Sequence, residues 1–354
     1  MRSFNILCCI SFAFLTSHVD GQADDCECVP FYLCKNGTIN TDGENIIDIR
    51  INTNDCPNYL EFCCSTKEIT EKPKPKSPLI TKSGCGYRNR NGVQYQITGD
   101  TNNEAQFGEF PWTLAILGKD DDTFSLNCGG SLIHPQVVLT AAHCVHSIEK
   151  IVVRAGEWDS KTIQEPLKHQ DVKVSSAAVH PQFNNKNLKN DIALLFLESP
   201  VSLEENHISL ACLPKQNKAP SSSRCYVNGW GKNHFGKDGV IQNILKKIEL
   251  PIVAHEQCEN DFRKTRLGKH FILNESFMCA GGEEGKDACT GDGGGPLVCP
   301  IEGEKDRYEQ VGIVSWGIGC GEEGVPGAYT DVARFRNWIR KQMLKKNFTN
   351  ANNK

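Results

Sequence analysis

Residues 287–296 read DACTGDGGGP, and two further motifs precede them: TAAHC at residues 140–144 and NDIALL at residues 190–195. Around these motifs, short apolar and β-branched runs alternate with Gly, Pro and Asn and show little helical period, as in VVLTA, IALLFL and VGIVSW. This spacing is typical of an all-β barrel or sandwich. The end of the chain differs, because its apolar residues lie three to four positions apart on one helical face. They predict a packed C-terminal helix: Val332, Phe335, Trp338, Ile339 and Met343.

The three motifs, in this order and with these flanking residues, strongly resemble the chymotrypsin and trypsin family over residues 97–345. The resemblance implies a double β-barrel in which His143 is the general base and Asp191 is the carboxylate that fixes the imidazole tautomer. Gly293 occupies the position of the family's nucleophilic serine. Since glycine has no side chain for His143 to activate, the resemblance predicts an inactive serine protease homologue.

No neighbouring side chain is expected to replace the missing serine. Thr290 lies three residues earlier, and Ser315 is expected on a separate strand. Loss of a triad member leaves a residual acceleration of about 10³ to 10⁴-fold, whereas enzymes typically reach about 10⁶-fold or more. An active trypsin-like protease is the alternative if Gly293 is a sequence error.

The residues around Gly293 match a trypsin-like primary specificity pocket. Asp287, six residues earlier in the chain, matches the acidic floor of that pocket. The resemblance places four more residues in its walls: Ser315, Trp316, Gly317 and Gly327. A Lys or Arg side chain could therefore dock there without being cut. The alternative is that Asp287 is a solvated acid in a loop.

The first residues have the order of a secretory signal: Arg2, an apolar run from Phe4 to Leu15, and small residues before Gln22. We expect residues 1–21 to form this signal, and a buried N-terminal helix is the alternative. The chain has 18 cysteines, of which Cys8 and Cys9 lie in the signal. The remaining even number favours disulfides in an oxidising compartment, so secretion is expected.

Six cysteines crowd into residues 26–64, a segment too short to build its own hydrophobic core. Six cysteines allow fifteen pairings, spacing does not choose among them, and a zinc site is a further alternative. The segment resembles the clip domain of arthropod serine proteases through its Cys-x-Cys start, its VPFYLC run and its closing pair of cysteines. That resemblance implies three pairs: Cys26 with Cys63, Cys28 with Cys56, and Cys34 with Cys64.

The trypsin resemblance implies five further disulfides and leaves no cysteine of the mature chain unpaired. The pairs are Cys85 with Cys212, Cys128 with Cys144, Cys225 with Cys299, Cys258 with Cys279, and Cys289 with Cys320. The first of these would keep the N-terminal part of the chain attached after any cut that follows Cys85.

Residues 65–96 are expected to be an extended linker, because alternating Lys and Pro offer nothing to bury. In active relatives a cut exposes an Ile or Val amino terminus, which inserts and pairs with the acid that matches Asp292. Here Gln96 precedes Ile97, and a trypsin-like activator should not cut after glutamine. Regulatory cleavage is expected upstream instead, at one of three basic residues: Lys82, Arg88 or Arg90.

One loop in the barrel region carries several oxygen donors: Glu157, Asp159, Thr162 and Glu165. Active relatives often hold calcium in this loop, and Ca²⁺ takes about six to eight oxygens from flexible loops. A solvated acidic turn is the alternative, since Lys161 and Lys168 partly neutralise the loop.

Three Asn-x-Ser/Thr sequons could accept glycans: Asn36, Asn274 and Asn347.

A clip domain ahead of a Ser-to-Gly protease domain resembles the clip-domain serine protease homologues of the prophenoloxidase-activating factor 2 type. The resemblance implies a non-catalytic cofactor of prophenoloxidase activation in arthropod haemolymph. Its partners would be prophenoloxidase or phenoloxidase and an upstream clip-domain protease, and it could form an oligomer after cleavage. The alternative is a protein that recognises microbial surfaces or mediates adhesion. A net charge of -4, without a Lys/Arg-rich block, favours neither nucleic acid nor an anionic membrane as a partner.

Overall fold

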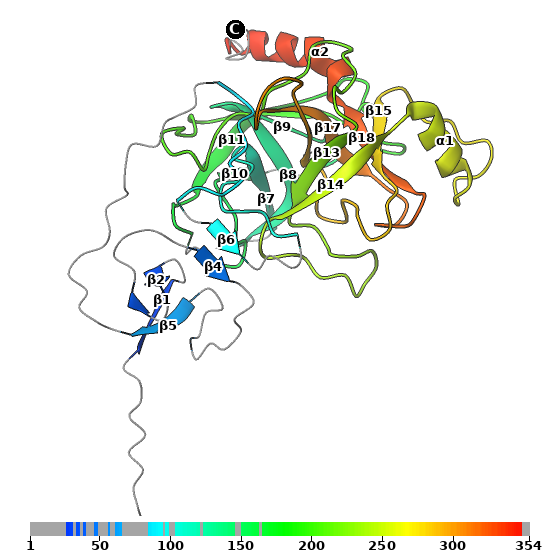
Figure 1. The fold of residues 1–354 in the computed structure, drawn as a ribbon. Helices are drawn as coiled ribbons and strands as arrows, with labels where there is room; N and C mark the ends of the chain where they lie inside the picture. The colour runs from blue at the N-terminus through cyan, green and yellow to red at the C-terminus, as the bar shows by residue number, and fades with distance from the viewer. Residues whose placement is uncertain are drawn as a thin grey trace, which may run out of the picture.

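The computed structural model describes residues 26–30, 33–35, 38–39, 46–48, 56, 61–65, 84–94, 96–98, 103–120, 123–145, 150–162 and 165–348. The expected signal at residues 1–21, the sequon at Asn36 and the cleavage candidate Lys82 lie outside these residues. Two six-stranded barrels make up most of the described chain (Figure 1). The prediction of a mostly β double barrel with a C-terminal helix is therefore confirmed.

The first barrel closes in the order β10-β11-β12-β9-β8-β7. Its strands are β7 (Thr113–Asp120), β8 (Thr123–His134), β9 (Val137–Thr140), β10 (Ile151–Ala155), β11 (Gln170–Val179) and β12 (Ala193–Leu197). Strands β9 and β12 are buried along their whole length, which explains why their sequences are continuously apolar instead of alternating. Their antiparallel register pairs Thr140 with Ala193 and so brings the TAAHC and NDIALL motifs to one end of the barrel.

The second barrel closes in the order β13-β14-β15-β18-β17-β16. Its strands are β13 (Arg224–Gly229), β14 (Lys246–Val253), β15 (Phe277–Gly281), β16 (Pro296–Pro300), β17 (Tyr308–Trp316) and β18 (Pro326–Asp331). Helix α1 (His255–Arg263) connects β14 to β15, and helix α2 (Val332–Lys345) follows β18. One cluster of buried apolar residues includes side chains of both barrels and of α2, so the two barrels share a core.

Helix α2 begins where the Asp331 side chain accepts a hydrogen bond from the backbone N–H of Ala333. This cap satisfies one of the free donors at the helix start. The predicted apolar face is buried against the barrels, with Trp338 partly buried at its edge. Packing of this face, more than local propensity, holds the helix in place.

The N-terminal segment contains a four-stranded sheet in the order β1-β5-β3-β2. The strands are β1 (Cys26–Pro30), β2 (Cys34–Lys35), β3 (Thr38–Ile39) and β5 (Glu61–Ser65). Three disulfides cross this small sheet, and they are the pairs that the clip resemblance implies. A separate strand, β4 (Ile46–Asp48), pairs in parallel with β6 (Gln96–Thr98), next to it in Figure 1.

The five disulfides of the barrel region also join the cysteines that the trypsin resemblance pairs. The pair of Cys85 and Cys212 spans 127 residues and fastens the segment in front of the barrels to them. Nearby, Gly86 lies at a φ of 77°, where a Cβ atom would approach the carbonyl oxygen of Tyr308 to 2.1 Å. Only glycine fits this close passage of the two backbones.

The expectation that Arg88 is an accessible cleavage site in an extended linker is wrong. Its side chain is only 6% exposed, and its guanidinium donates to a carboxylate oxygen of buried Glu109 at 2.9 Å. The guanidinium also donates to the Tyr308 hydroxyl at 3.0 Å and lies 4.1 Å from the ring centroid of Tyr226. The carboxylate and the aromatic rings compensate the lost hydration of Arg88. Arg90, in contrast, keeps 59% of its side chain exposed.

Replacing Arg88 with Gln should destabilise the protein strongly, because it leaves the Glu109 carboxylate buried with Lys247 as its remaining cation. We expect a loss of about 3 kcal/mol in the free energy of unfolding, measured by urea denaturation. The matched variant Arg90→Gln should lose less than about 1 kcal/mol, since its ion pair is exposed. Equal losses in the two variants would contradict the structural role of Arg88.

Candidate functional site

His143 and Asp191 form the hydrogen-bonded pair that the resemblance implies. The His143 Nδ1 atom lies 2.7 Å from Asp191 Oδ2, and the His143 backbone N–H donates to Oδ1 at 2.9 Å. The Ser315 hydroxyl donates to Oδ2 at 2.6 Å, and the Asp191 side chain is fully buried. These contacts orient the imidazole with its Nε2 atom toward the place where a nucleophile would stand.

That place is empty of any reactive side chain because residue 293 is glycine. A Cβ atom built on Gly293 would lie 2.7 Å from His143 Nε2, closer than carbon and nitrogen atoms pack. The imidazole therefore lies slightly too close for a serine to fit without a shift of the ring. The same Nε2 atom lies 3.6 Å from Cys144 Sγ, but this sulfur is bonded to Cys128 and cannot act as a nucleophile.

The variant Gly293→Ser should not become a working protease. Its new side chain needs the His143 ring to move, and Asp292 is already hydrogen-bonded to backbone amides instead of to a new amino terminus. We expect turnover of an Arg-containing chromogenic ester at least about 10³-fold below that of an active trypsin-like enzyme. Labelling of the variant at residue 293 by a fluorophosphonate, detected by mass spectrometry, would show that the serine alone is enough.

A cavity of about 270 Å³ adjoins the His143–Gly293 pair. All five residues predicted for the specificity pocket line it: Asp287, Ser315, Trp316, Gly317 and Gly327. They come from β17, from β18 and from the loops that the disulfide of Cys289 and Cys320 joins. Phe235 also lines this cavity, and no motif in the sequence indicated it.

Asp287 presents a carboxylate without a cationic partner in the described part of the chain. Its Oδ2 atom accepts a 3.3 Å hydrogen bond from the Gly321 N–H, whereas its buried Oδ1 atom has no hydrogen-bond partner there. Burial raises the pKa of Asp287 to about 7. A carboxylate in this state gains its missing partner when an ammonium, amidinium or guanidinium group enters the cavity.

We expect p-aminobenzamidine, an aromatic amidinium, to bind in this cavity and to depend on pH. Because the empty site holds a proton on Asp287 below its pKa of about 7, binding must release that proton. Affinity should fall about tenfold per pH unit just below pH 7 and level off above it. The variant Asp287→Asn should lose at least about tenfold in affinity by fluorescence titration, whereas the exposed-acid control Glu302→Gln should not. A flat pH profile would refute this assignment.

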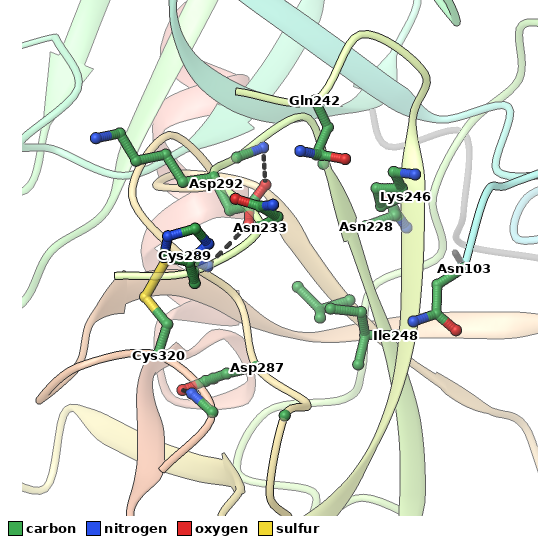
Figure 2. Close-up of a pocket in the computed structure, with 17 residues that line it drawn as sticks. Asn103, Asn228, Asn233, Gln242, Lys246, Ile248, Asp287, Cys289, Asp292 and Cys320 are labelled. Carbon is green, nitrogen blue, oxygen red and sulfur yellow. Dashed lines mark hydrogen bonds between the residues drawn. A yellow bond between two sulfur atoms is a disulfide. The ribbon is translucent and has the colours of Figure 1, made fainter. Parts of the chain in front are cut away.

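Asp292 is held by the backbone and not by a new amino terminus. Its carboxylate accepts hydrogen bonds from the N–H groups of Gly231 at 2.7 Å and Cys289 at 2.9 Å, which Figure 2 shows. Burial raises the pKa of Asp292 to about 6. Glycine is required at positions 229 and 231, where a Cβ atom would come within 2.1 and 2.4 Å of the carboxylate oxygens.

A second cavity, of about 190 Å³, lies between Asp292 and Asp287 and is drawn in Figure 2. Asn103 at its rim follows β6 in the chain by a few residues. Strand β6 itself pairs with β4, with Ile97 opposite Ile47, so the backbone of the recognisable activation segment is not inserted beside Asp292.

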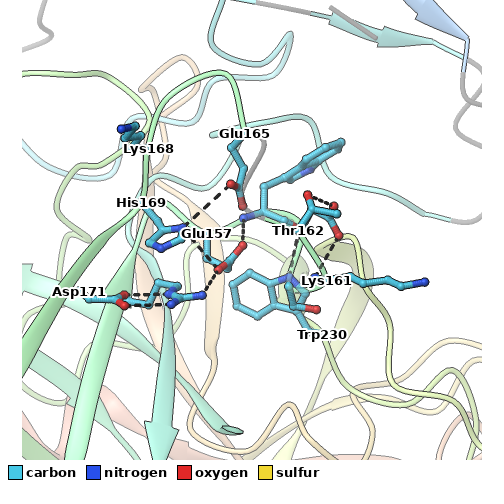
Figure 3. Close-up of polar contacts among 12 residues, drawn as sticks. Glu157, Lys161, Thr162, Glu165, Lys168, His169, Asp171 and Trp230 are labelled. Atoms are coloured by element: carbon cyan, nitrogen blue, oxygen red, sulfur yellow. Dashed lines mark hydrogen bonds and ion pairs between the residues drawn. The ribbon is translucent and has the colours of Figure 1, made fainter. Parts of the chain in front are cut away.

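The acidic loop brings together two of the four residues expected to hold calcium. Glu157 and Glu165 are both buried, and each has an Oε2 atom close to His169 Nδ1, at 3.9 and 4.0 Å (Figure 3). Asp159 and Thr162 instead hydrogen-bond to each other at 2.7 Å. Sequence reasoning missed His169, because a lone histidine four residues after Glu165 carries no metal signature of its own.

The electrostatics of this cluster fit a cation. Burial, together with the neighbouring carboxyl group of Glu165, raises the pKa of Glu157 to about 9. Both carboxylate oxygens of Glu165 are buried and have no hydrogen-bond partner in the described part of the chain. Oxygen atoms of this kind are the donors that Ca²⁺ prefers. Arg154 lies 3.0 Å from Glu157 Oε2 and partly supplies the missing positive charge.

Two of the sequons lie in the described chain. The Asn274 side chain is partly exposed and accepts a hydrogen bond from the Ser276 N–H at 3.1 Å. Asn347 is exposed just after α2 and has a positive φ of 61°. Their use as glycan acceptors stays a prediction.

The double barrel, the His143–Asp191 pair and the adjoining pocket define a trypsin-like serine protease fold whose nucleophile position holds glycine. The family model described as Trypsin matches residues 97–339, and the model described as Serine protease Clip domain PPAF-2 matches residues 16–65. The chain belongs to the trypsin family and is a clip-domain serine protease homologue.

Three curated relatives are similar to this chain over most of its length. Phenoloxidase-activating factor 2 of Galleria mellonella is 53% identical over 277 residues, which cover 75% of this chain and 91% of the relative. Inactive CLIP domain-containing serine protease A8 of Anopheles gambiae is 40% identical over 88% of this chain and 87% of its own length. Inactive CLIP domain-containing serine protease A28 of Anopheles gambiae is 37% identical over 96% of both chains.

These matches confirm the resemblance drawn from the motifs, and two of the relatives are named inactive. As a disulfide-rich clip-domain protease homologue, the protein is extracellular. Within the described residues, neither helix combines the length and apolar character needed to cross a bilayer.

Proposed function

We propose that this protein is a non-catalytic cofactor of prophenoloxidase activation in haemolymph, which binds its partners and does not cut them. The observation that carries the proposal is the Asp287 carboxylate, which has no cationic partner in the described part of the chain and lines a pocket beside Gly293. The pocket can bind a basic side chain, while the position that would attack the bound peptide has no side chain. The name of the Galleria mellonella relative supports the pathway.

The described chain also supports regulation by a cut that does not separate its parts. Arg90 is exposed and follows Cys85 in the chain. Cys85 is bonded to Cys212, which lies in the segment between β12 and β13. A cut after Arg90 would therefore release strand β6 from the residues before it while the clip segment stays covalently attached. We propose an upstream clip-domain protease as the enzyme that makes such a cut and prophenoloxidase or phenoloxidase as the partner of the processed form.

A reconstituted activation assay tests this function. Prophenoloxidase and its activating protease would be incubated with the intact protein, with the cut protein, or with neither, and phenoloxidase activity would be measured. We expect the cut form to change the yield of active phenoloxidase and the Asp287→Asn variant to lose much of that effect, with Glu302→Gln as the control. An unchanged yield of phenoloxidase in every combination would exclude the cofactor role. Microbial-surface recognition would then be the remaining function, and sedimentation of the protein with bacterial or fungal cell walls would test it.

We also propose that Glu157 and Glu165 bind a calcium ion. Since Glu157 holds a proton up to about its pKa of 9 in the ion-free site, Ca²⁺ must displace that proton and bind more weakly as the pH falls. At a Ca²⁺ concentration of about 100 times Kd, the native state should gain about 2.7 kcal/mol, seen as a higher melting temperature. The variant Glu165→Gln should lose this gain, and the exposed-acid control Glu302→Gln should keep it.

Terbium luminescence gives a second measure of the same site. Trp158 donates its backbone N–H to Glu157 Oε1 at 3.1 Å, so its indole is a near neighbour that can sensitise a bound lanthanide. We expect Tb³⁺ emission in the parent protein that Ca²⁺ displaces. Emission of equal strength in Glu165→Gln would place the ion elsewhere.

A further inference from the structure

Three large apolar side chains are exposed within one short hairpin, residues 232–242. Phe235 is 63% exposed, Val240 is 62% exposed and Ile241 is 45% exposed. Exposed apolar residues scattered singly are ordinary on protein surfaces, and Ile272, 75% exposed in the loop after α1, is such a case. A group of them on one element instead indicates a surface that another molecule covers.

Hydrogen bonds fix the backbone of the hairpin, so its exposed apolar side chains have a defined arrangement. The Asn233 N–H donates to the Val240 carbonyl at 3.1 Å, and the Val240 N–H donates to the Asn233 side chain at 3.0 Å. The Lys232 ammonium donates to the Gly236 carbonyl at 2.9 Å and closes the turn. A hairpin fixed in this way loses little conformational freedom when a partner binds.

The hairpin borders the cavity that contains Asp287. Phe235 lines the same cavity as Asp287 and His143. Ile241 lies against the glycine-rich loop, since its Cδ1 atom lies 3.5 Å from the position of a Cβ on Gly291, which also lines the cavity. An apolar rim and an unpaired carboxylate therefore lie on one continuous surface. A carboxylate next to exposed apolar side chains is complementary to a peptide segment in which a cationic side chain lies next to apolar ones.

We propose that the hairpin 232–242 and the Asp287 cavity bind one segment of a partner protein, in which a Lys or Arg is flanked by apolar residues. The basic side chain enters the cavity, and the flanking residues pack on Phe235, Val240 and Ile241. This inference rests on the proposed function, because it takes the cavity to bind a basic side chain without cutting the chain. It adds that the apolar rim, and not the cavity alone, selects the partner.

Two labelled peptides and a small ligand separate the parts of this inference. The peptides share a central Arg, which is flanked by Phe, Leu and Ile in one and by Ser and Gly in the other, and p-aminobenzamidine probes the cavity alone. We expect the apolar peptide to bind the parent protein at least about tenfold more tightly by fluorescence anisotropy, as burial of apolar surface predicts. The variants Phe235→Ser and Val240→Ser should each reduce this preference at least about threefold.

The matched control is Ile272→Ser, which removes another exposed apolar side chain that does not line the cavity and should keep the full preference. If p-aminobenzamidine binds but the protein binds the two peptides with equal affinity, the inference is overturned and the proposed function stays intact. Failure of p-aminobenzamidine and both peptides to bind would overturn the proposed function itself. A concentration-dependent dimer in sedimentation velocity, lost in Val240→Ser, would assign the rim to a second copy of this chain and also overturn the inference.

Discussion

The buried carboxylate of Asp191 ties the two barrels together. It binds the ring and the backbone N–H of His143 from the first barrel, and it accepts the Ser315 hydroxyl from β17 of the second. The carbonyl of Asp191 also accepts the Thr330 hydroxyl of β18 at 2.8 Å. A buried carboxylate is costly without such donors, so these contacts require the barrels to meet in one arrangement.

This arrangement does not depend on catalysis. The donors to Asp191 come from groups that are present whether residue 293 carries a hydroxyl or not. The cleft therefore keeps its shape with Gly293, and what changes is local: His143 Nε2 lies within 2.7 Å of where a Cβ would stand. Loss of one side chain thus removes the reaction while the scaffold that positions a bound peptide is retained.

The sequence was sufficient to predict those parts of the fold that follow from a repeated pattern of residues. Short apolar runs broken by Gly, Pro and Asn indicated an all-β barrel or sandwich, and the spacing of Val332 to Met343 indicated α2. It failed where partners distant in the chain decide the outcome. Arg88 looked solvated because nothing near it in sequence reveals Glu109 or Tyr308, which is 220 residues away. Phe235 was missed for the same reason, because it meets Asp287 and His143 only in the folded cavity.

The buried Asp287 carboxylate at the floor of the pocket, which has no cationic partner in the described chain, lowers the stability of the folded state when it is ionised. This cost links binding to stability. Because burial raises the pKa of Asp287 from its ordinary range to about 7, the folded state holds a proton that the unfolded chain has lost. Stability contributed by that proton is present at low pH and is lost as the pH rises through about 7. A cation bound in the pocket removes this penalty at neutral and higher pH. The pocket is therefore least favourable when empty and ionised, which is the condition under which it binds a basic side chain most strongly.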